Sequence, residues 1–304
     1  MRVLGLILII ITSFFFTGIV FRTKSIFSGR KGRSIFQPMN DIWRLMRKGS
    51  VYSQTSSFIF RIAPSIYFAS VIIAIMLIPF GGQKGIFSFN CDFVFFAYIL
   101  AVGKFFNLVG ALDTGSSFEG MGASREALYS LLAEPAFFIL MGSFALLTGY
   151  TSFSDIFISI HFGSYISYAI VALAAYILII IAMVENSRMP VDDPKTHLEL
   201  TMVHEVMILD NSGFDLGLIF YATNLKFAMY GAILANLFLT PGKEWFLSIP
   251  IFVVVQILFA IIVGIIESFI ARFRMNHNSQ FIFALTSISL IIFLTVLLMV
   301  GKFL

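Results

Sequence analysis

The stretch ENSRMPVDDPKTHLELTMVHEVMILDNSG, residues 185–213, is the most concentrated polar segment of a very apolar chain. It lies between two long apolar runs, at 163–184 and 216–239. Six of the 16 acidic residues fall within it, namely Glu185, Asp192, Asp193, Glu199, Glu205 and Asp210. Because charged groups are costly to remove from water, this concentration indicates that the segment 185–215 is a polar loop with a function of its own.

The composition of the whole chain is that of an integral membrane protein. Of its 304 residues, 59% are hydrophobic and 12% are charged, and the mean hydropathy is +0.96, whereas roughly a quarter of the residues of a soluble domain are charged. The apolar runs have the roughly 20 residues that a helical span needs, and they lack the alternation of a membrane barrel. We therefore predict one all-α membrane domain over 1–304 with about eight transmembrane helices, at 3–21, 58–80, 91–112, 130–149, 163–184, 216–239, 247–270 and 281–302.

The positively charged residues predict how these spans are oriented. They are frequent in alternate loops, which are the segment 22–57, the loop with Arg125, the polar loop 5–6 and the loop with Arg272 and Arg274. The opposite side has Arg2, Lys84, Lys243 and Lys302. By the positive-inside rule, both termini then lie outside and loop 5–6 lies in the cytoplasm. The first apolar run is too long for a signal peptide, so we expect an uncleaved first helix.

The segment 22–57 is predicted to contain a short amphipathic helix at the membrane surface. Pro38 suits the first turn of a helix, and Ile42, Leu45 and Met46 then recur at helical spacing. Basic residues occupy other positions around them: Arg44, Arg47 and Lys48. Such a helix can anchor on lipid headgroups or dock a partner protein, and composition alone does not separate these two roles.

The loop at 113–127 is rich in glycine and serine, so its backbone can turn tightly and approach another chain closely. It lacks the pattern of a phosphate-binding loop. In loop 5–6, Asp193 followed by Pro194 is typical of a helix start, which predicts a helix over about 194–209. His197 and His204 could share a face of it, but no third zinc ligand is placed by spacing, and we interpret them as polar surface histidines.

Four charged residues lie within or near the ends of apolar runs: Lys104, Glu134, Lys226 and Glu267. A charge at the bilayer centre costs at least about 2.5 kcal/mol, so several of them indicate a hydrated or mutually paired interior. Ion pairing between helices, for example of Lys104 with Glu134, would explain them, and so would a proton path through desolvated carboxylates. Glu267 could also pair at the interface with Arg272 or Arg274.

Short motifs along nearly the whole chain match one family. They are Q-P-x-x-D-x-x-R-L at Gln37–Leu45 followed by Lys48, Ala63-Pro64, Arg125 with Glu134, R-x-P-x-D-x-P with E-L over Arg188–Leu200, and R-x-R at Arg272–Arg274. In these motifs the chain resembles subunit 1 of respiratory complex I. It resembles more closely the relative of that subunit in membrane-bound [NiFe] hydrogenases, the formate hydrogenlyase subunit 4 branch.

Departures from the complex I pattern favour the hydrogenase branch. Lys195 and His197 stand where the complex I family has two glutamates, and Glu267 replaces an arginine. Loop 5–6 is also longer than in that family. The stretch Leu112–Glu126 looks like the hydrogenase branch, although Glu119 stands where a glycine is expected.

The resemblance implies a membrane anchor and coupling subunit of an energy-converting [NiFe] hydrogenase or formate hydrogenlyase-type complex in the cell inner membrane. Such a subunit links hydrogenase-type large and small subunits to antiporter-like membrane subunits that translocate protons or sodium ions. The NiFe centre and the iron–sulfur clusters are then expected on partner chains. The single Cys91 agrees with this, since it excludes a cluster held by this chain alone. We expect no cofactor, no metal, no catalytic residue and no nucleic-acid partner on this chain.

The resemblance also implies roles for particular residues. The expected coupling and proton-path residues are Glu134, Glu185, Arg188, Asp192, Asp193, Glu199, Glu205, Lys104, Lys226 and Glu267. The expected partner-docking residues are Gln37, Asp41, Arg44, Arg125, Arg272 and Arg274. In this interpretation a charge change at the redox partner alters the ion pairs of loop 5–6, and the protonation of buried carboxylates shifts.

Two other functions compete with this one. A quinone-site subunit of a complex I-like NADH or related dehydrogenase would also use cavity-lining loops and a surface helix, but the acidic pattern of that family is broken at Lys195 and His197. A free-standing secondary transporter would need paired repeats with broken helices near the bilayer midplane, and the sequence contains no internal repeat.

Overall fold

The structure is a computed structural model that describes residues 2–160, 165–193, 202–239 and 245–301. Within these ranges helices are the regular elements, apart from one isolated β-bridge between Phe80 and Gln83. Eight of the helices in these ranges are long and apolar enough to cross a membrane. They are α1 (Arg2–Phe27), α3 (Phe58–Leu77), α4 (Asp92–Asp113), α5 (Ser117–Thr148), α7 (Tyr165–Glu185), α9 (Gly213–Asn236), α10 (Trp245–Phe269) and α11 (Met275–Met299). The predicted all-α membrane fold with eight spans is confirmed.

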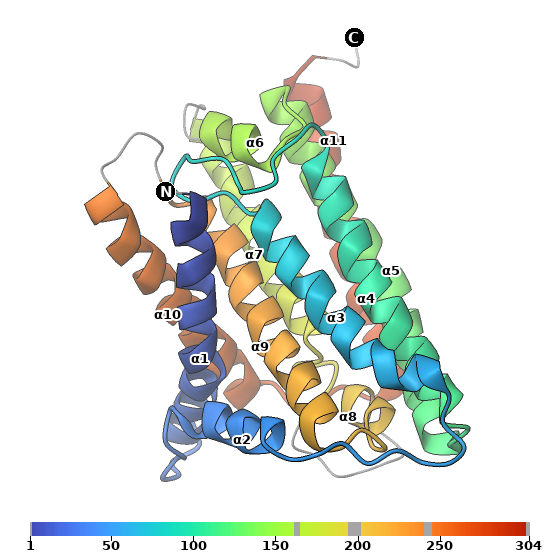
Figure 1. The fold of residues 1–304 in the computed structure, drawn as a ribbon. Coiled ribbons are helices and arrows are strands. Elements are labelled where there is room, and N and C mark those ends of the chain that lie inside the picture. Colours follow the sequence, from blue (N-terminus) through green and yellow to red (C-terminus); the bar gives the residue numbers. More distant parts are fainter. Residues whose placement is uncertain (1, 161–164, 194–201, 240–244, 302–304) are drawn as a thin grey trace.

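Helix α9 forms the centre of the bundle. Of its most apolar window 78% is buried, against 22% for α4. It packs against α1, α3, α7 and α10, and Figure 1 shows it between α1 and α3. A helix that is covered on most sides must be apolar nearly all round. Lys226 on this helix is only 2% exposed, so its charge has to be balanced by neighbouring helices.

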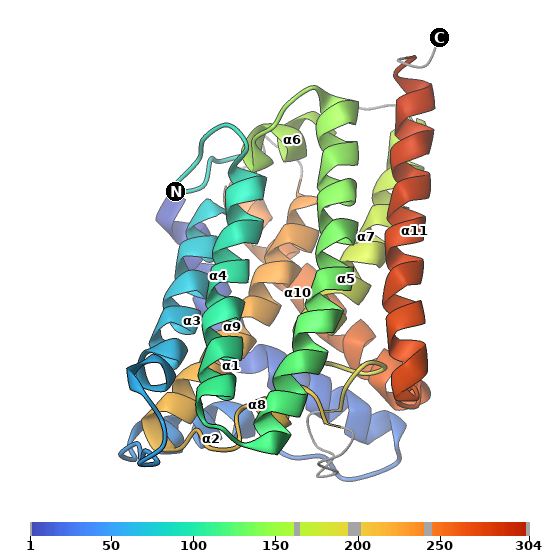
Figure 2. The same ribbon diagram turned by 90° about the vertical axis from the view of Figure 1, so that its right-hand side faces the viewer.

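Helices α4, α5 and α11 form one side of the bundle (Figure 2), where α4 packs on α3 and α5 packs on α11. Their outward faces expose large apolar side chains, among them Tyr98, Phe105, Leu131, Phe283 and Leu298. Exposed apolar surface on this scale is what a protein presents to lipid or to other membrane helices.

The two ends of the bundle are covered by different elements. The short helices α2 (Gln37–Met46) and α8 (His204–Met207) lie at one end, which we call the α2 end. The short helix α6 (Phe153–Ile160), the start of α1 and the end of α11 lie at the other, the α6 end (Figures 1 and 2). All four of the loops predicted to be cytoplasmic therefore meet at the α2 end. The assignment of that end to the cytoplasm stays a prediction.

The predicted amphipathic surface helix is present as α2. Its apolar residue Ile42 is buried, whereas Arg44 and Arg47 are exposed. Helix α2 lies across α9 at Gly217, where an added Cβ would come within 3.1 Å of the Met46 side chain. The small residue on α9 therefore lets the surface helix pack directly onto the central helix.

Helix α5 begins at Ser117, well before the predicted span start at 130, because the Gly- and Ser-rich stretch is mostly helical. The tight turn is confined to the link around Gly115, which has a φ of 70°. The close approach expected from the glycines is made by Gly122 within this chain. A Cβ at Gly122 would lie 2.9 Å from the carbonyl oxygen of Val203.

The predicted helix over 194–209 is not continuous in its described part, and residues 194–201 lie outside the described ranges. Helix α8 is a single turn, and residues 202 and 203, which are described before it, are not helical. Arg125 on α5 donates to the carbonyl oxygen of Met202 at 3.0 Å, and the Asp192 carboxylate accepts the N–H groups of the next two residues at 3.2 and 3.1 Å. These bonds use backbone groups that a continuous helix would need for itself.

Candidate functional site

A buried carboxylate with two lysines lies where α4, α7 and α9 meet. Glu185 is the last residue of α7, and its Oε2 accepts from the Nζ atoms of Lys104 at 2.9 Å and Lys226 at 2.8 Å. Lys226 also donates to the Glu185 carbonyl oxygen at 2.8 Å. One carboxylate therefore holds two helices in register through two ammonium groups that are hardly exposed.

A second carboxylate from α5 completes this cluster. Glu126 lies 3.6 Å from the Lys104 ammonium, which also donates to Ser130 at 2.7 Å. Two lysines and two glutamates make the cluster neutral, which is the condition under which buried charges are tolerated. We call Lys104, Glu126, Glu185 and Lys226 the central cluster.

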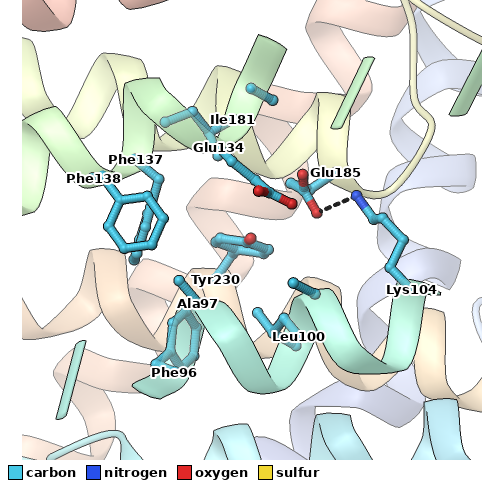
Figure 3. Close-up of a pocket in the computed structure, with 12 residues that line it drawn as sticks. Phe96, Ala97, Leu100, Lys104, Glu134, Phe137, Phe138, Ile181, Glu185 and Tyr230 are labelled. Atoms are coloured by element: carbon cyan, nitrogen blue, oxygen red, sulfur yellow. Dashed lines mark hydrogen bonds and ion pairs between the residues drawn. The ribbon is translucent and has the colours of Figure 1, made fainter. Parts of the chain in front are cut away.

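The expected pairing of Lys104 with Glu134 is wrong, because the ammonium of Lys104 pairs with Glu126 of α5 and Glu185 of α7 instead. Glu134 instead lines a small cavity of about 30 Å³ next to the central cluster, together with Tyr230 and Glu185. Figure 3 shows the two carboxylates and the tyrosine ring pointing toward one another. Glu134 thus lies beside the central cluster, without a direct ion pair among the described residues.

Arg188 and Glu267 form a second buried group between loop 5–6 and α10. Their side chains lie 3.3 Å apart, and Lys24 of α1 approaches the same carboxylate at 3.6 Å. The Arg188 guanidinium also lies over the rings of Phe21 and Phe227, at 5.2 and 5.5 Å from their centroids. The expectation that Glu267 pairs with Arg272 or Arg274 is therefore wrong, since Glu267 pairs with Arg188 of loop 5–6.

Asp192 fixes the path of loop 5–6. Its carboxylate pairs with Arg272 at 2.8 Å and accepts three backbone N–H groups, from Asp193, Val203 and His204. Burial raises the pKa of Asp192, and those donors act in the opposite direction. Arg272, expected to dock a partner, is in this structure a support of the loop. Asp193 lies 3.8 Å from Lys24, which links this group to the previous one.

Helix α5 holds residues 202–210, the second half of loop 5–6, in place. Glu119, which is 0% exposed, accepts the backbone N–H of Asp210 at 2.8 Å. Gly122 admits α8 against the helix, and Arg125 holds the carbonyl of Met202. The glutamate at 119, where a glycine was expected, thus has a clear structural task. Arg125, predicted to dock a partner, is used inside the chain.

The remaining predicted residues lie nearer the surface of the α2 end. Gln37 donates to Asp41 at 2.8 Å within α2, and Arg44 and Arg274 are exposed. Glu199 lies outside the described residues, as do Lys195 and His197. Glu205 lines a cavity described next. Sequence reasoning missed Glu126 and Lys24, and Glu126 could have been found if its stretch had been taken as helical.

A larger cavity of about 340 Å³ opens at the α2 end, between α1, α2, α9 and loop 5–6. Its apolar lining includes Phe21, Ile42 and Phe220, and its polar lining includes Arg188 and Asp41. His204 also lines it, and the Nε2 atom of this residue is buried with no hydrogen-bond partner among the described residues. His204, expected to be a polar surface histidine, is half-buried, because α8 is packed onto α5.

The described residues contain no group of three or more His, Cys, Asp or Glu side chains that could hold a metal ion. That metals and clusters reside on partner chains stays a prediction.

The geometry can now be set beside known proteins. A family described as NADH dehydrogenase matches residues 1–298 of the chain. The chain belongs to this family. Members that it resembles include "Hydrogenase-4 component C" of Escherichia coli (strain K12), which is 28% identical over 301 residues, covering 96% of this chain and 94% of the relative. "Formate hydrogenlyase subunit 4" of the same strain is 24% identical over 275 residues, covering 88% and 89%.

Among solved structures, the fold of this NADH dehydrogenase family chain is similar to a chain of the membrane-bound sulfane sulfur reductase, described as an archaeal respiratory membrane complex. The TM-score is 0.81 at 20% identity, and the match covers 96% of this chain and 98% of that one. The family predicted from short motifs is confirmed, and the relatives include the hydrogenase branch. The chain is a multi-pass membrane protein of this family.

Proposed function

We propose that this chain is the membrane anchor and coupling subunit of an energy-converting [NiFe] hydrogenase or formate hydrogenlyase-type complex. Two of its relatives are named as hydrogenase-4 and formate hydrogenlyase components, and the alignment with each covers most of both chains. The observation that carries the proposal is a set of buried charges beside loop 5–6: Arg188 pairs with Glu267, Glu185 pairs with two lysines, and Glu134 lines the cavity next to Glu185.

The coupling role follows from how the loop is connected. Glu185 ends α7 and Arg188 follows three residues later, so a movement of the loop backbone displaces both charges. If Glu185 moves away from Lys104, that ammonium is left with the carboxylates of α5 as counter-ions. A cation that comes closer to a carboxylate favours the ionised form and releases a proton, and its return favours proton uptake.

The redox partners are placed at the α2 end in this proposal. The exposed basic residues Arg44 and Arg274 offer attachment points there for hydrogenase-type large and small subunits. Antiporter-like membrane subunits are placed against α4 and α5, where the cavity beside Glu134 lies between the two helices. The α2 end is then cytoplasmic, both termini lie outside, and the complex lies in the cell inner membrane. The NiFe centre and iron–sulfur clusters belong to the partner chains.

The proposal is tested with Glu134→Gln and Asp192→Asn variants in the complete complex. We expect the complex to assemble and to oxidise or evolve hydrogen, but to translocate at least tenfold fewer ions per hydrogen molecule. Asp155→Asn at the α6 end is the matched control, since Asp155 is partly exposed and pairs loosely with Lys84 at 3.9 Å. Normal ion translocation by both test variants would contradict the proposal.

A second candidate function is that of a quinone-site subunit of a complex I-like dehydrogenase. The cavity of about 340 Å³ at the α2 end favours it, because its lining combines apolar side chains with polar groups that could hydrogen-bond a quinone headgroup. A mild-detergent pull-down of the native complex, followed by mass spectrometry and a nickel assay, separates the two. A nickel-containing large subunit with hydrogen-dependent dye reduction supports the hydrogenase, whereas a nickel-free, quinone-linked assembly supports the dehydrogenase.

A further inference from the structure

His204 is a half-buried titratable group that the proposed set of coupling residues does not include. It begins α8, and its backbone N–H donates to Asp192 at 3.1 Å, so its position is set by the loop. Its ring lines the cavity at the α2 end. The Nε2 atom is buried and has no hydrogen-bond partner in the part of the chain that the structure describes.

Charged groups on α5, loop 5–6, α9 and α4 act on the ring. Glu126 of α5 and Asp192 of loop 5–6 act on the imidazole and favour its charged form. Lys226 of α9 and Lys104 of α4 act against that form. On the cavity side the lining also contains Arg33, Asp41, Arg188 and Glu205. Three of the four central-cluster residues thus influence His204 directly.

Burial is the largest influence on the ring and lowers the pKa of His204. The imidazole is therefore neutral at pH 7, with one ring nitrogen able to accept a proton. Ser187 reinforces the connection, because it lines the same cavity and its hydroxyl lies 3.5 Å from Glu126 Oε2.

The packing also keeps the ring in place. Helix α8 rests on α5 at Gly122, where an added Cβ would lie 3.0 Å from the backbone nitrogen of Met207. Gly122 lies one helical turn before Glu126 on the same face of α5. The contact that admits α8 therefore brings the histidine to the level of the central cluster.

We infer that His204 is the proton-exchanging residue between the cavity at the α2 end and the central cluster. One ring nitrogen takes a proton from water on the cavity side, and the resulting imidazolium gives a proton from its other nitrogen to the Glu126 carboxylate. The ring is neutral again after the transfer, and Glu126 has gained the proton that the cavity lost. The inference rests on the proposed coupling function.

The test compares His204→Gln with His277→Gln in the complete complex reconstituted in sealed vesicles. His277 is an exposed histidine at the same end, hydrogen-bonded to Gln280 within α11, and serves as the matched control. We expect His204→Gln to keep hydrogen-dependent dye reduction and to lose at least tenfold in ions translocated per hydrogen molecule. His277→Gln is expected to match the wild type.

A chemical rescue separates proton exchange from a structural role. His204→Ala leaves room beside the cavity, so added imidazole should restore ion translocation, more strongly at pH values where neutral imidazole is present. Full translocation by His204→Gln would overturn the inference, and so would a lack of rescue in an assembled His204→Ala complex. Failure of both variants to assemble would also overturn it, because the histidine would then act by supporting the fold.

Glu185→Gln is measured in parallel to distinguish the two proposals. If Glu185→Gln is uncoupled while His204→Gln is normal, the inference fails and the coupling function stands. If both variants translocate ions normally, the coupling function itself fails.

Discussion

Buried acids at opposite ends of the bundle, Asp92 on one side and Glu185 and Glu267 on the other, are held by different kinds of donor. At the α6 end, Asp92 is 0% exposed and accepts from the backbone N–H of Phe153 at 2.6 Å and from Ser152 at 3.1 Å, with no cation in ion-pair contact among the described residues. At the α2 end, Glu185 and Glu267 are held by lysine and arginine. Neutral backbone donors fix a carboxylate in one place, whereas ammonium groups on flexible side chains can be exchanged between carboxylates. Under the proposed function, the donors of Asp92 serve structure, whereas the cations at Glu185 and Glu267 serve charge movement.

The largest expected effect is at the centre of the charged end. Glu185→Gln leaves Lys104 and Lys226 with one carboxylate fewer, and breaking such a buried pair typically costs about 3–5 kcal/mol. We expect the thermal stability of the complex to fall sharply and ion translocation to be lost. Glu185→Gln combined with Lys226→Met should recover part of the stability, as measured by thermal unfolding, without recovering translocation. Equal stability of the single and double variants would contradict the ion-pair account.

The clamp between α5 and α8 is the next test. Gly122→Ala places a Cβ 2.9 Å from the Val203 carbonyl oxygen, so α8 must shift, at a cost of about 1–3 kcal/mol. We expect weaker ion translocation together with a lower unfolding temperature. Gly142→Ala on the same helix is the control, because no described atom lies within 4 Å of its added Cβ. Similar behaviour of the two variants would mean that the close contact has no role in coupling.

At the α6 end we expect the contrasting result. Asp92→Ala leaves the buried N–H of Phe153 without its acceptor, which costs about 1–3 kcal/mol. We expect a lower unfolding temperature and an unchanged number of ions translocated per hydrogen molecule. A changed ratio would show that the α6 end also takes part in coupling and would remove the distinction between the ends.

The pH dependence of stability sharpens the comparison further. Because the pKa of His204 is lowered in the folded chain, the neutral ring stabilises the fold above the unfolded pKa of about 6.5. That contribution is lost as the pH falls through the lowered value. We expect the unfolding temperature of the wild type to drop on acidification below about pH 6.5, and that of His204→Gln to drop less. The difference between the two curves isolates His204 from Asp192, whose raised pKa acts in the opposite direction.

The smallest effect is expected at the exposed basic residues. Arg44→Gln and Arg274→Gln should weaken the association with redox partners modestly and mainly at low salt, because exposed ion pairs contribute about 0–1 kcal/mol. Pull-down yields at two salt concentrations measure this. Lys84→Gln at the α6 end is the control, and an equal loss with it would argue against docking at the α2 end.

Local pattern was enough to predict the spans and the surface helix. These features depend on apolar residues that lie within a few helical turns of one another, such as Ile42, Leu45 and Met46 in the surface helix. The pairing of the charges was not predictable in this way. Asp192 and Arg272 are eighty positions apart in the sequence and meet only when loop 5–6 folds against the end of α10. Lys104 had several acids within plausible reach, and helix rotation decides among them.

The position of Glu126 in the site could have been predicted from its spacing in the sequence. Glu126, Ser130 and Glu134 are spaced by four residues, which places them on one face of a continuous helix. The span was predicted to begin at 130, because the glycines and serines before it indicated a loop. Tertiary packing against α8 makes those small residues useful inside a helix, and single-segment propensity does not reveal that.

The order of the charged residues along the chain bears on how the protein enters the bilayer during synthesis. Lys104 on α4 is followed by Glu126 on the very next helix, so Lys104 can pair with Glu126 when the α4–α5 hairpin inserts. Glu185 arrives with α7 and can pair with the lysine already inserted, and Lys226 then arrives with α9 and finds that carboxylate. Since an unpaired charge in the bilayer costs at least about 2.5 kcal/mol, this order gives each new charge in the cluster a partner within one or two helices. If Lys226 were on a helix before α7, it would enter the bilayer before its partner Glu185.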